Sequence, residues 1–325
     1  MRIQLNWFGE KLATRLADIE AGRIAPAAPR DAATVVILRS AQQPPGDDRA
    51  PDTMAEPSGA PRGVRGVVPP GDDRAPDTMA PSAIGRDIQV LMLRRTAAMK
   101  FAPGAYVFPG GSVDPADYSA EVGWHGPSPA EFGARLGASA EVARALVCAA
   151  VRETFEESGV LLAGAPGSPP AVPAGPSWDV DRAALAAGTL TLAELLSRRG
   201  LVLRADLLVP WARWITPEGE PRRFDARFFA AALPDGQQAV GHAAEAEHVA
   251  WLRPASAIDA ARAGEISLLP PTAATLNQLA SAVAAGAGLD GILATRPAIE
   301  PVCPRLLLDD GQAWLVIPDG VGYPL

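Results

Sequence analysis

The sequence predicts an α/β fold in which helices cover both faces of a central sheet. Runs rich in β-branched residues, which are typical of strands, are interleaved with segments that have helical spacing. The chain has 325 residues, of which 48% are hydrophobic, so it can bury a sizeable core. An interleaved order of strands and helices favours a sheet packed between helical layers.

The first predicted strand is residues 33–39 and the second is residues 88–94. Between them, residues 44–55 recur without change as residues 69–80. The Pro, Gly and Asp content of this unit cannot bury enough apolar surface to repay ordering. We therefore predict a disordered, duplicated insertion over residues 42–82, with a duplicated binding motif as the alternative.

The next predicted elements surround a glycine pair. A short strand at residues 105–108 leads into Gly110 and Gly111, and a loop follows from residue 112 to 137. A helix is predicted from residue 140 to 158, because Ser139 can cap its start and Gly159 is suited to the positive φ that commonly ends a helix.

The remaining elements complete the predicted layers. We expect residues 1–32 to form an N-terminal helical segment and residues 33–325 to form one domain. After the glycine pair and its helix come a helix at 179–199, strands at 207–215, 226–233 and 249–252, helices at 256–263 and 272–285, and a C-terminal hairpin of residues 305–308 and 313–317.

The bulk composition narrows the function classes. A formal net charge of −8 argues against a general nucleic-acid binder. Cys148 and Cys303 form neither a disulfide framework nor a metal-ligand cluster, which indicates reduced thiols in a cytoplasmic protein. No apolar run has the length of a membrane span, and residues 1–20 lack the apolar core of a signal peptide.

Acidic residues gather on one side of the predicted 140–158 helix. At 100° per residue, Glu153, Glu156 and Glu157 lie within about a 100° arc. The opposite side carries an apolar stripe. Glu153 and Glu157 are like charges at i, i+4, and they lie near the helix C-terminus, where negative charge is unfavourable. A divalent cation would reverse this penalty, because Mg²⁺ prefers hard oxygen ligands. The alternative is a solvated acidic face.

Residues 152–160, Arg-Glu-Thr-Phe-Glu-Glu-Ser-Gly-Val, resemble the R-E-U-x-E-E-x-G-U half of the Nudix box, with Thr154 at a position that is usually aliphatic. Gly110 and Gly111 resemble the entry to that box. Most family members have a short spacer with one more Glu between the halves. Here about forty residues intervene, and Arg144 stands where that Glu would be.

The long spacer is similar to that of one subgroup, the coenzyme A and acyl-CoA diphosphatases, which carry an insertion inside the box. We assign residues 112–138 to that insertion. The resemblance spans residues 33–324 apart from the duplicated segment, and it also rests on residues 94–95, 101, 103–114, 212–219, 222–229 and 268–272.

The resemblance implies a Nudix-type α/β/α sandwich with a mixed sheet, extra helices and the C-terminal hairpin. It also implies Mg²⁺-dependent or Mn²⁺-dependent cleavage of coenzyme A or acyl-CoA to 3′,5′-ADP and (acyl-)4′-phosphopantetheine. Three sets of site residues follow. The metal ligands would be Glu153, Glu156, Glu157 and Gly111. The catalytic group would be Glu153, Arg152, Glu245 and Glu247. The substrate-binding group would be Arg94, Arg95, Gly110, Gly111 and Arg223.

Several alternatives remain open at the level of the sequence. Arg152 would orient a glutamate by a charge-assisted hydrogen bond, or it forms only a surface ion pair with Glu156. The water-activating base would be Glu153, Glu245 or Glu247. The substrate could instead be another nucleoside diphosphate derivative, such as NADH, ADP-ribose or a nucleotide sugar, and the fold could serve as a ligand sensor without turnover. We expect a small-molecule nucleotide as partner and no nucleic acid, and the sequence leaves a homodimer open.

Overall fold

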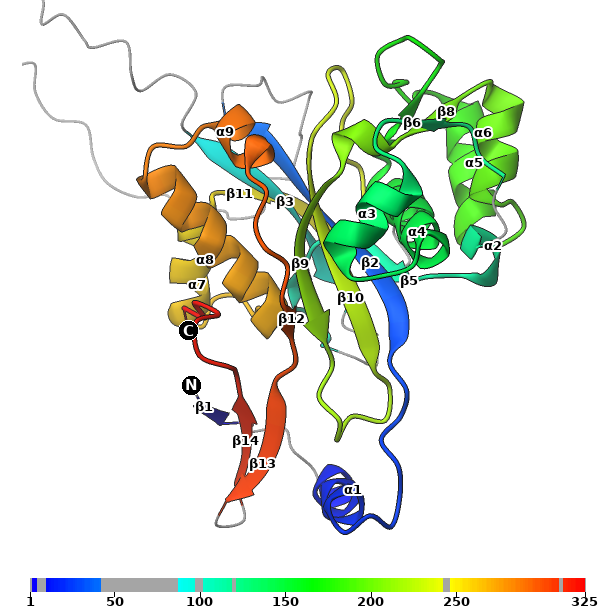
Figure 1. The fold of residues 1–325 in the computed structure, drawn as a ribbon. Helices are drawn as coiled ribbons and strands as arrows, with labels where there is room; N and C mark the ends of the chain where they lie inside the picture. Colours follow the sequence, from blue (N-terminus) through cyan, green and yellow to red (C-terminus); the bar gives the residue numbers. More distant parts are fainter. Residues whose placement is uncertain are drawn as a thin grey trace, which may run out of the picture.

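The computed structural model describes residues 2–4, 10–41, 87–96, 102–118, 121–241, 246–309 and 312–324. Its central sheet has the strand order β11-β3-β2-β10-β9-β12, with β4 paired to β3 and β5 paired to β2 (Figure 1). The β2–β10 and β9–β12 pairs are parallel and the others are antiparallel, so the predicted mixed sheet is confirmed. The strands are β2 Arg30–Ser40, β3 Ile88–Arg95, β4 Tyr106–Val107, β5 Gly110–Ser112, β9 Val209–Ile215, β10 Phe224–Ala232, β11 Ala246–Leu252 and β12 Pro301–Val302.

Helices cover both faces of this sheet, as predicted. Successive side chains of a strand point to opposite faces. On β2, Val35 and Ile37 pack in the cluster that contains α4 (Ala140–Ser158), whereas Val36 and Leu38 pack in the cluster that contains α8 (Pro270–Ala284). In Figure 1, α3 (Pro129–Leu136) lies with α4 on one side, and α7 (Pro254–Arg262) lies with α8 on the other.

The pairing of β2 is split between two partners, and this split positions the glycine pair. The C-terminal end of β2 pairs with β3, whereas Ala33 pairs with Gly111 and Thr34 pairs with Gly110 of β5. The amide of Val35 donates to the carbonyl of Pro109 at 2.9 Å. As a result, Gly110 and Gly111 are fixed on the sheet at the face covered by α4.

Helix α4 begins and ends where the sequence predicts. The Ser139 hydroxyl accepts a hydrogen bond from the amide of Val142 at 3.2 Å, and Gly159 ends the helix with a φ of 72°. Its apolar stripe is buried, as expected from the spacing of Val147, Val151 and Phe155. The helix is enclosed by β2 and by α3 and α5, so apolar residues outside the stripe are buried as well.

Two of the predicted segments, residues 112–137 and residues 179–199, differ in the structure. Residues 112–137, expected to be a loop, contain α2 (Pro115–Tyr118), β6 (Trp124–His125) and α3; a reciprocal capping box between Ser128 and Glu131 starts α3. The expected 179–199 helix is two helices, α5 (Pro176–Ala186) and α6 (Leu192–Arg199), because Gly188 has a φ of 67° and a second capping box restarts the helix.

The predicted C-terminal hairpin is present as β13 (Arg305–Asp309) and β14 (Gln312–Val316), and β1 (Arg2–Gln4) pairs with β14 to form a separate sheet. Leu16 of α1 (Glu10–Glu20) packs with Leu306 and Leu315 of this sheet. The two ends of the chain are therefore joined. The duplicated segment 42–82 lies outside the described residues. Within the part of the chain that the structure describes, we find no helix long and apolar enough to cross a bilayer.

Candidate active site on helix α4

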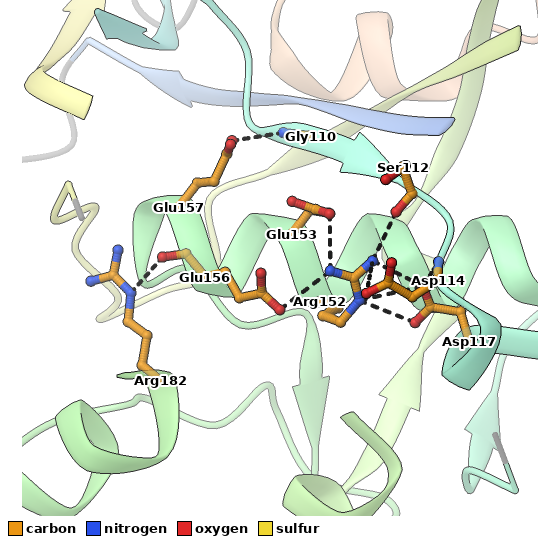
Figure 2. A network of polar contacts seen from close by, with 9 residues as sticks. All are labelled: Gly110, Ser112, Asp114, Asp117, Arg152, Glu153, Glu156, Glu157 and Arg182. Carbon is orange, nitrogen blue, oxygen red and sulfur yellow. Dashed lines mark hydrogen bonds and ion pairs between the residues drawn. The ribbon is translucent and has the colours of Figure 1, made fainter. Parts of the chain in front are cut away.

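Two of the three box glutamates face β5. The carboxylate of Glu157 accepts a hydrogen bond from the amide of Gly110 at 2.8 Å (Figure 2). Glu153, one turn earlier on the same side of α4, lies beside Gly111. Figure 2 shows both side chains rising from the helix toward the strand. The two carboxylates are therefore held side by side against one short stretch of backbone.

Neighbouring atoms approach Gly110 and Gly111 so closely that a side chain at either position would overlap them. A Cβ atom on Gly111 would lie 2.6 Å from the Cδ atom of Glu153, and a Cβ atom on Gly110 would lie 2.7 Å from the Cα atom of Thr34. Both distances are shorter than any carbon–carbon contact without displacement. Glycine at both positions lets β5 pass between β2 and the acidic face of α4.

Arg152 connects the remaining glutamate to the rest of the site. Its Nη1 donates to Glu153 Oε1 at 2.9 Å and to Glu156 Oε1 at 3.3 Å, and its Nη2 donates to the carbonyl of Ser112 at 2.9 Å. Only 9% of the Arg152 side chain is exposed, so the alternative of a surface ion pair is wrong. Arg152 is a buried residue that orients two carboxylates.

Asp117 completes this network, and our reading of the sequence missed it. It lies on α2 with its side chain 2% exposed, and its Oδ2 accepts from Arg152 Nη2 at 2.9 Å. The Nε of Arg152 also donates to Asp117, at 3.2 Å to Oδ1. The resemblance places the spacer acid near Arg144, whereas the structure supplies an acid near the start of the inserted segment 112–138. An acidic residue shortly after Gly111 was the signal that could have found it.

The network shifts the pKa values of its members. Burial alone would lower the pKa of Arg152, but its hydrogen bonds to Asp117 and the charges of Glu153 and Glu156 together raise it. Burial raises the pKa of Glu156, and the nearby charge of Arg152 only partly opposes this. The arginine stays charged, and a nearby cation favours the negative charge of Glu156.

The carboxylates of Glu153, Glu156 and Glu157 can be compared with the ligands that a hard divalent cation requires. Within the described ranges, no group of three or more His, Cys, Asp or Glu side chains lies close enough together to hold a metal ion by itself. Glu156 is turned toward Arg152, whereas Glu153 and Glu157 face β5 (Figure 2). Mg²⁺ typically takes one or two carboxylates and completes its shell with water and substrate phosphate oxygens. Two adjacent carboxylates beside the half-buried backbone of β5 fit that pattern of donors.

Comparison with known proteins shows what this chain resembles. Residues 132–279 match the model of the NUDT19 Nudix domain. The acyl-coenzyme A diphosphatase NUDT19 of Homo sapiens is 32% identical over 230 residues, which cover 59% of this chain and 60% of that protein. The NUDT19 protein of Gallus gallus is 30% identical over 235 residues, which cover 59% of this chain and 61% of that protein. Over the matched residues, the chain is similar to Nudix hydrolases.

A solved structure extends the comparison to the fold. The crystal structure of a NUDIX hydrolase from Alicyclobacillus acidocaldarius superposes with a TM-score of 0.57 at 24% identity, covering 84% of this chain and 98% of that one. The predicted Nudix-type sandwich is confirmed by this match. The chain spans about three-fifths of the length of the NUDT19 proteins that it resembles.

The predicted substrate-binding arginines lie apart from one another. Arg94 is exposed and Arg95 is half-buried. Because side chains alternate along β3, Arg95 shares the α4 face with Leu91, whereas Arg94 is on the face with Met92. Arg95 is thus the one on the same face of the sheet as the Nudix glutamates.

Arg223 lies outside the network around the Nudix helix. Its side chain is buried, and it donates from Nε to the carbonyl of Thr216 at 2.9 Å and from Nη1 to the carbonyl of Ala27 at 2.8 Å. These bonds tie the start of β10 to the N-terminal segment. The placement favours a structural role for Arg223 over the predicted contact with substrate.

The side chains of Glu245 and Glu247, the two predicted acids near β11, lie outside the part of the chain whose side chains are described. Glu245 lies outside the described residues. The backbone of Glu247 belongs to β11, at an irregularity in the pairing where Ala246 is opposite Arg95 and His248 is opposite Arg94. A role as general base stays a prediction for both residues.

Proposed function

We propose that this protein is a Mg²⁺- or Mn²⁺-dependent hydrolase that cleaves the pyrophosphate bond of coenzyme A or acyl-CoA. The products would be 3′,5′-ADP and 4′-phosphopantetheine or its acylated form. The observation that carries the proposal is the placement of Glu153 and Glu157 side by side against Gly110 and Gly111, with buried Arg152 behind them.

The proposed ligands are Glu153, Glu156 and Glu157, together with the backbone of Gly111. A divalent cation bound there would neutralise charge on the pyrophosphate oxygens and lower the pKa of a bound water. Arg152 holds the carboxylates of Glu153 and Glu156 in place through charge-assisted hydrogen bonds. The glycine pair leaves backbone, rather than side chains, at the place where the phosphates would approach.

Hydrolysis also requires a group that accepts a proton from the attacking water. Glu153 is the candidate whose position is described, since its carboxylate lies at the face of α4 that meets β5. Glu245 and Glu247 are the other candidates. A general base must be within hydrogen-bond reach of the water or one water away, and Glu153 would meet this requirement for a water held against the same short strand.

Coenzyme A as the substrate is supported by the names of the relatives. The human and chicken proteins are acyl-coenzyme A diphosphatases. Coenzyme A carries a 3′-phosphate that ADP-ribose and NADH lack, so its recognition requires additional positive charge. Arg95 is our first candidate for this contact and Arg94 the second, because a guanidinium matches phosphate oxygens bidentately.

A hydrolysis panel tests this proposal. Coenzyme A, an acyl-CoA, 3′-dephospho-CoA, NADH, ADP-ribose and ATP are each incubated with the protein and Mg²⁺, and the products are separated by chromatography. We expect coenzyme A and acyl-CoA to have the highest kcat/KM values. Equal kcat/KM for coenzyme A and 3′-dephospho-CoA would remove the substrate assignment, and no hydrolysis of any compound would favour a ligand sensor.

A further inference from the structure

The C-terminal turn of α4, which carries Glu156 and Glu157, is held by groups from outside the helix. The last carbonyls of a helix have no partner within it. Here the amide of Gly159 donates to the carbonyl of Phe155 at 2.9 Å, and the amide of Val240 donates to the carbonyl of Ser158 at 2.7 Å. Between them, the Nε of Arg182 donates to the carbonyl of Glu156 at 2.9 Å (Figure 2).

Arg182 joins two segments that lie far apart in the sequence. It is on α5, and besides Glu156 it contacts the loop that follows β10, where its Nη2 donates to the carbonyl of Val240 at 2.8 Å. A guanidinium is planar and presents its donors in a fixed fork. One side chain therefore fixes the last turn of the glutamate helix relative to the loop at Val240.

The packing around Arg182 is close. A Cβ atom on Gly159 would lie 3.3 Å from the Nη1 of Arg182, so the helix-ending glycine also leaves room for the guanidinium. The charge is complementary, because the C-terminus of a helix is electronegative and this one carries glutamates in its last two turns. Burial lowers the pKa of Arg182, against the opposing charges of Asp179 and Glu157. An arginine remains protonated at neutral pH even so.

We propose that Arg182 is a positioning residue that sets the orientation of the Glu156 and Glu157 carboxylates for metal binding. The inference rests on the proposed function, because it assumes that these carboxylates hold a divalent cation. Arg182 contacts the main chain of the turn rather than the carboxylates. Its effect on the metal is therefore indirect, through the direction in which the turn presents its two glutamates.

The test measures metal binding directly, without turnover. Mn²⁺ is titrated into the full-length protein and free Mn²⁺ is followed by electron paramagnetic resonance, for wild type, Arg182→Ala and Arg182→Lys. The matched control is Arg204→Ala, since Arg204 also donates to a backbone carbonyl, that of Ser168 at 2.8 Å, but contacts no group of α4 through its side chain. Circular dichroism and the Tm of each variant report whether it is folded.

Loss of an outer-shell partner typically weakens metal binding by about 10-fold to 100-fold. We expect the Kd for Mn²⁺ to rise at least about 10-fold in Arg182→Ala, to rise less in Arg182→Lys, and to stay at the wild-type value in Arg204→Ala. A wild-type Kd in Arg182→Lys would show that the fork of hydrogen bonds from Arg182 to the carbonyls of Glu156 and Val240 is not needed, which would overturn the inference. Equal changes of Kd in Arg182→Ala and Arg204→Ala would overturn it as well. A wild-type Kd in Arg182→Ala would contradict the inference alone, whereas a wild type that binds no Mn²⁺ and hydrolyses nothing would contradict the proposed function.

Discussion

Asp117 of α2, near the start of the inserted segment, and Arg152 of α4 form a buried ion pair, with Oδ2 and Nη2 2.9 Å apart. The two side chains are 2% and 9% exposed. The start of the inserted segment is thus joined to the second half of the box, because Asp117 in that segment binds the arginine that follows it. Through Arg152, this acid also holds Glu153 and Glu156 in place.

Replacing Asp117 should therefore destabilise the fold. Asp117→Ala leaves the buried guanidinium of Arg152 with less negative charge around it, and breaking a buried pair typically costs about 3 kcal/mol. We expect a loss of about that size in the free energy of unfolding, measured by urea denaturation. The control is Asp206→Ala, which removes the partly exposed pair with Arg204 and should cost less than about 1 kcal/mol. Equal losses in the two variants would contradict a special role for Asp117.

Glu157→Gln separates the metal-binding role of Glu157 from its structural one. The amide oxygen of glutamine can still accept the hydrogen bond from Gly110, so the Tm should change little. The negative charge is lost, and kcat should fall at least about 100-fold, as is typical when a transition-state charge loses its stabilisation. Steady-state kinetics and thermal unfolding on the same preparation check both parts. Unchanged turnover would show that Glu157 is not a ligand.

Gly111→Ala should reduce activity by displacing Glu153. The added methyl group would overlap the carboxylate, which must rotate away from β5. We expect kcat/KM to fall about 10-fold or more, since small misplacements of reacting groups have large effects on rate. Gly291→Ala is the matched control, because its Cβ would meet only the side chain of Ala287 at 3.7 Å. Similar kinetics in the two variants would argue against close approach as the reason for glycine at position 111.

The two cysteines should differ in reactivity. Burial raises the pKa of Cys148 to about 12, with the charge of Asp117 adding to it, whereas Cys303 is half-buried. The thiolate is the reactive form, so Cys148 should stay unmodified by a disulfide reagent at pH 8 until the protein unfolds, and Cys303 should react first. Counting released thiolate with and without guanidinium chloride checks this. Modification of both thiols at one rate in the folded protein would contradict the burial of Cys148.

The same shift predicts a dependence of stability on pH. The folded form keeps Cys148 protonated to about pH 12, whereas the unfolded chain releases this proton near the ordinary thiol pKa of 9.0. The unfolded state therefore binds fewer protons than the folded state above pH 9.0, and stability should fall as the pH rises from there. Cys148→Ser should flatten this fall in urea denaturation curves measured between pH 8 and pH 10. An identical fall in the variant would assign it to other groups.

The sequence was sufficient to predict α4 and its ends, because Ser139, the apolar stripe and Gly159 are local signals. The glutamates could be placed on one side of it for the same reason. The pairing of Arg152 with Asp117 was missed, since Asp117 lies in an inserted segment whose path is set by tertiary packing. Arg94 and Arg95, adjacent in sequence, were treated alike, whereas strand alternation places them on opposite faces of the sheet.

The contribution of α5 could not be predicted either. The expected 179–199 helix is divided by a glycine and a capping box into α5 and α6, and Arg182 on α5 meets the carbonyl of Glu156. These two signals are visible in the sequence at Gly188 and Thr191. What they bring together, an arginine and the end of a distant helix, depends on the packing of whole elements.

The central claim is that the carboxylates of α4 hold a divalent cation against a pyrophosphate. Its most direct test is the release of 3′,5′-ADP from coenzyme A by the full-length protein, followed by chromatography after metal removal with EDTA and after re-addition of Mg²⁺. We predict no release in EDTA and full recovery with excess Mg²⁺ in the wild type, with no recovery in Glu157→Gln. Release of 3′,5′-ADP at the same rate in EDTA would contradict the account.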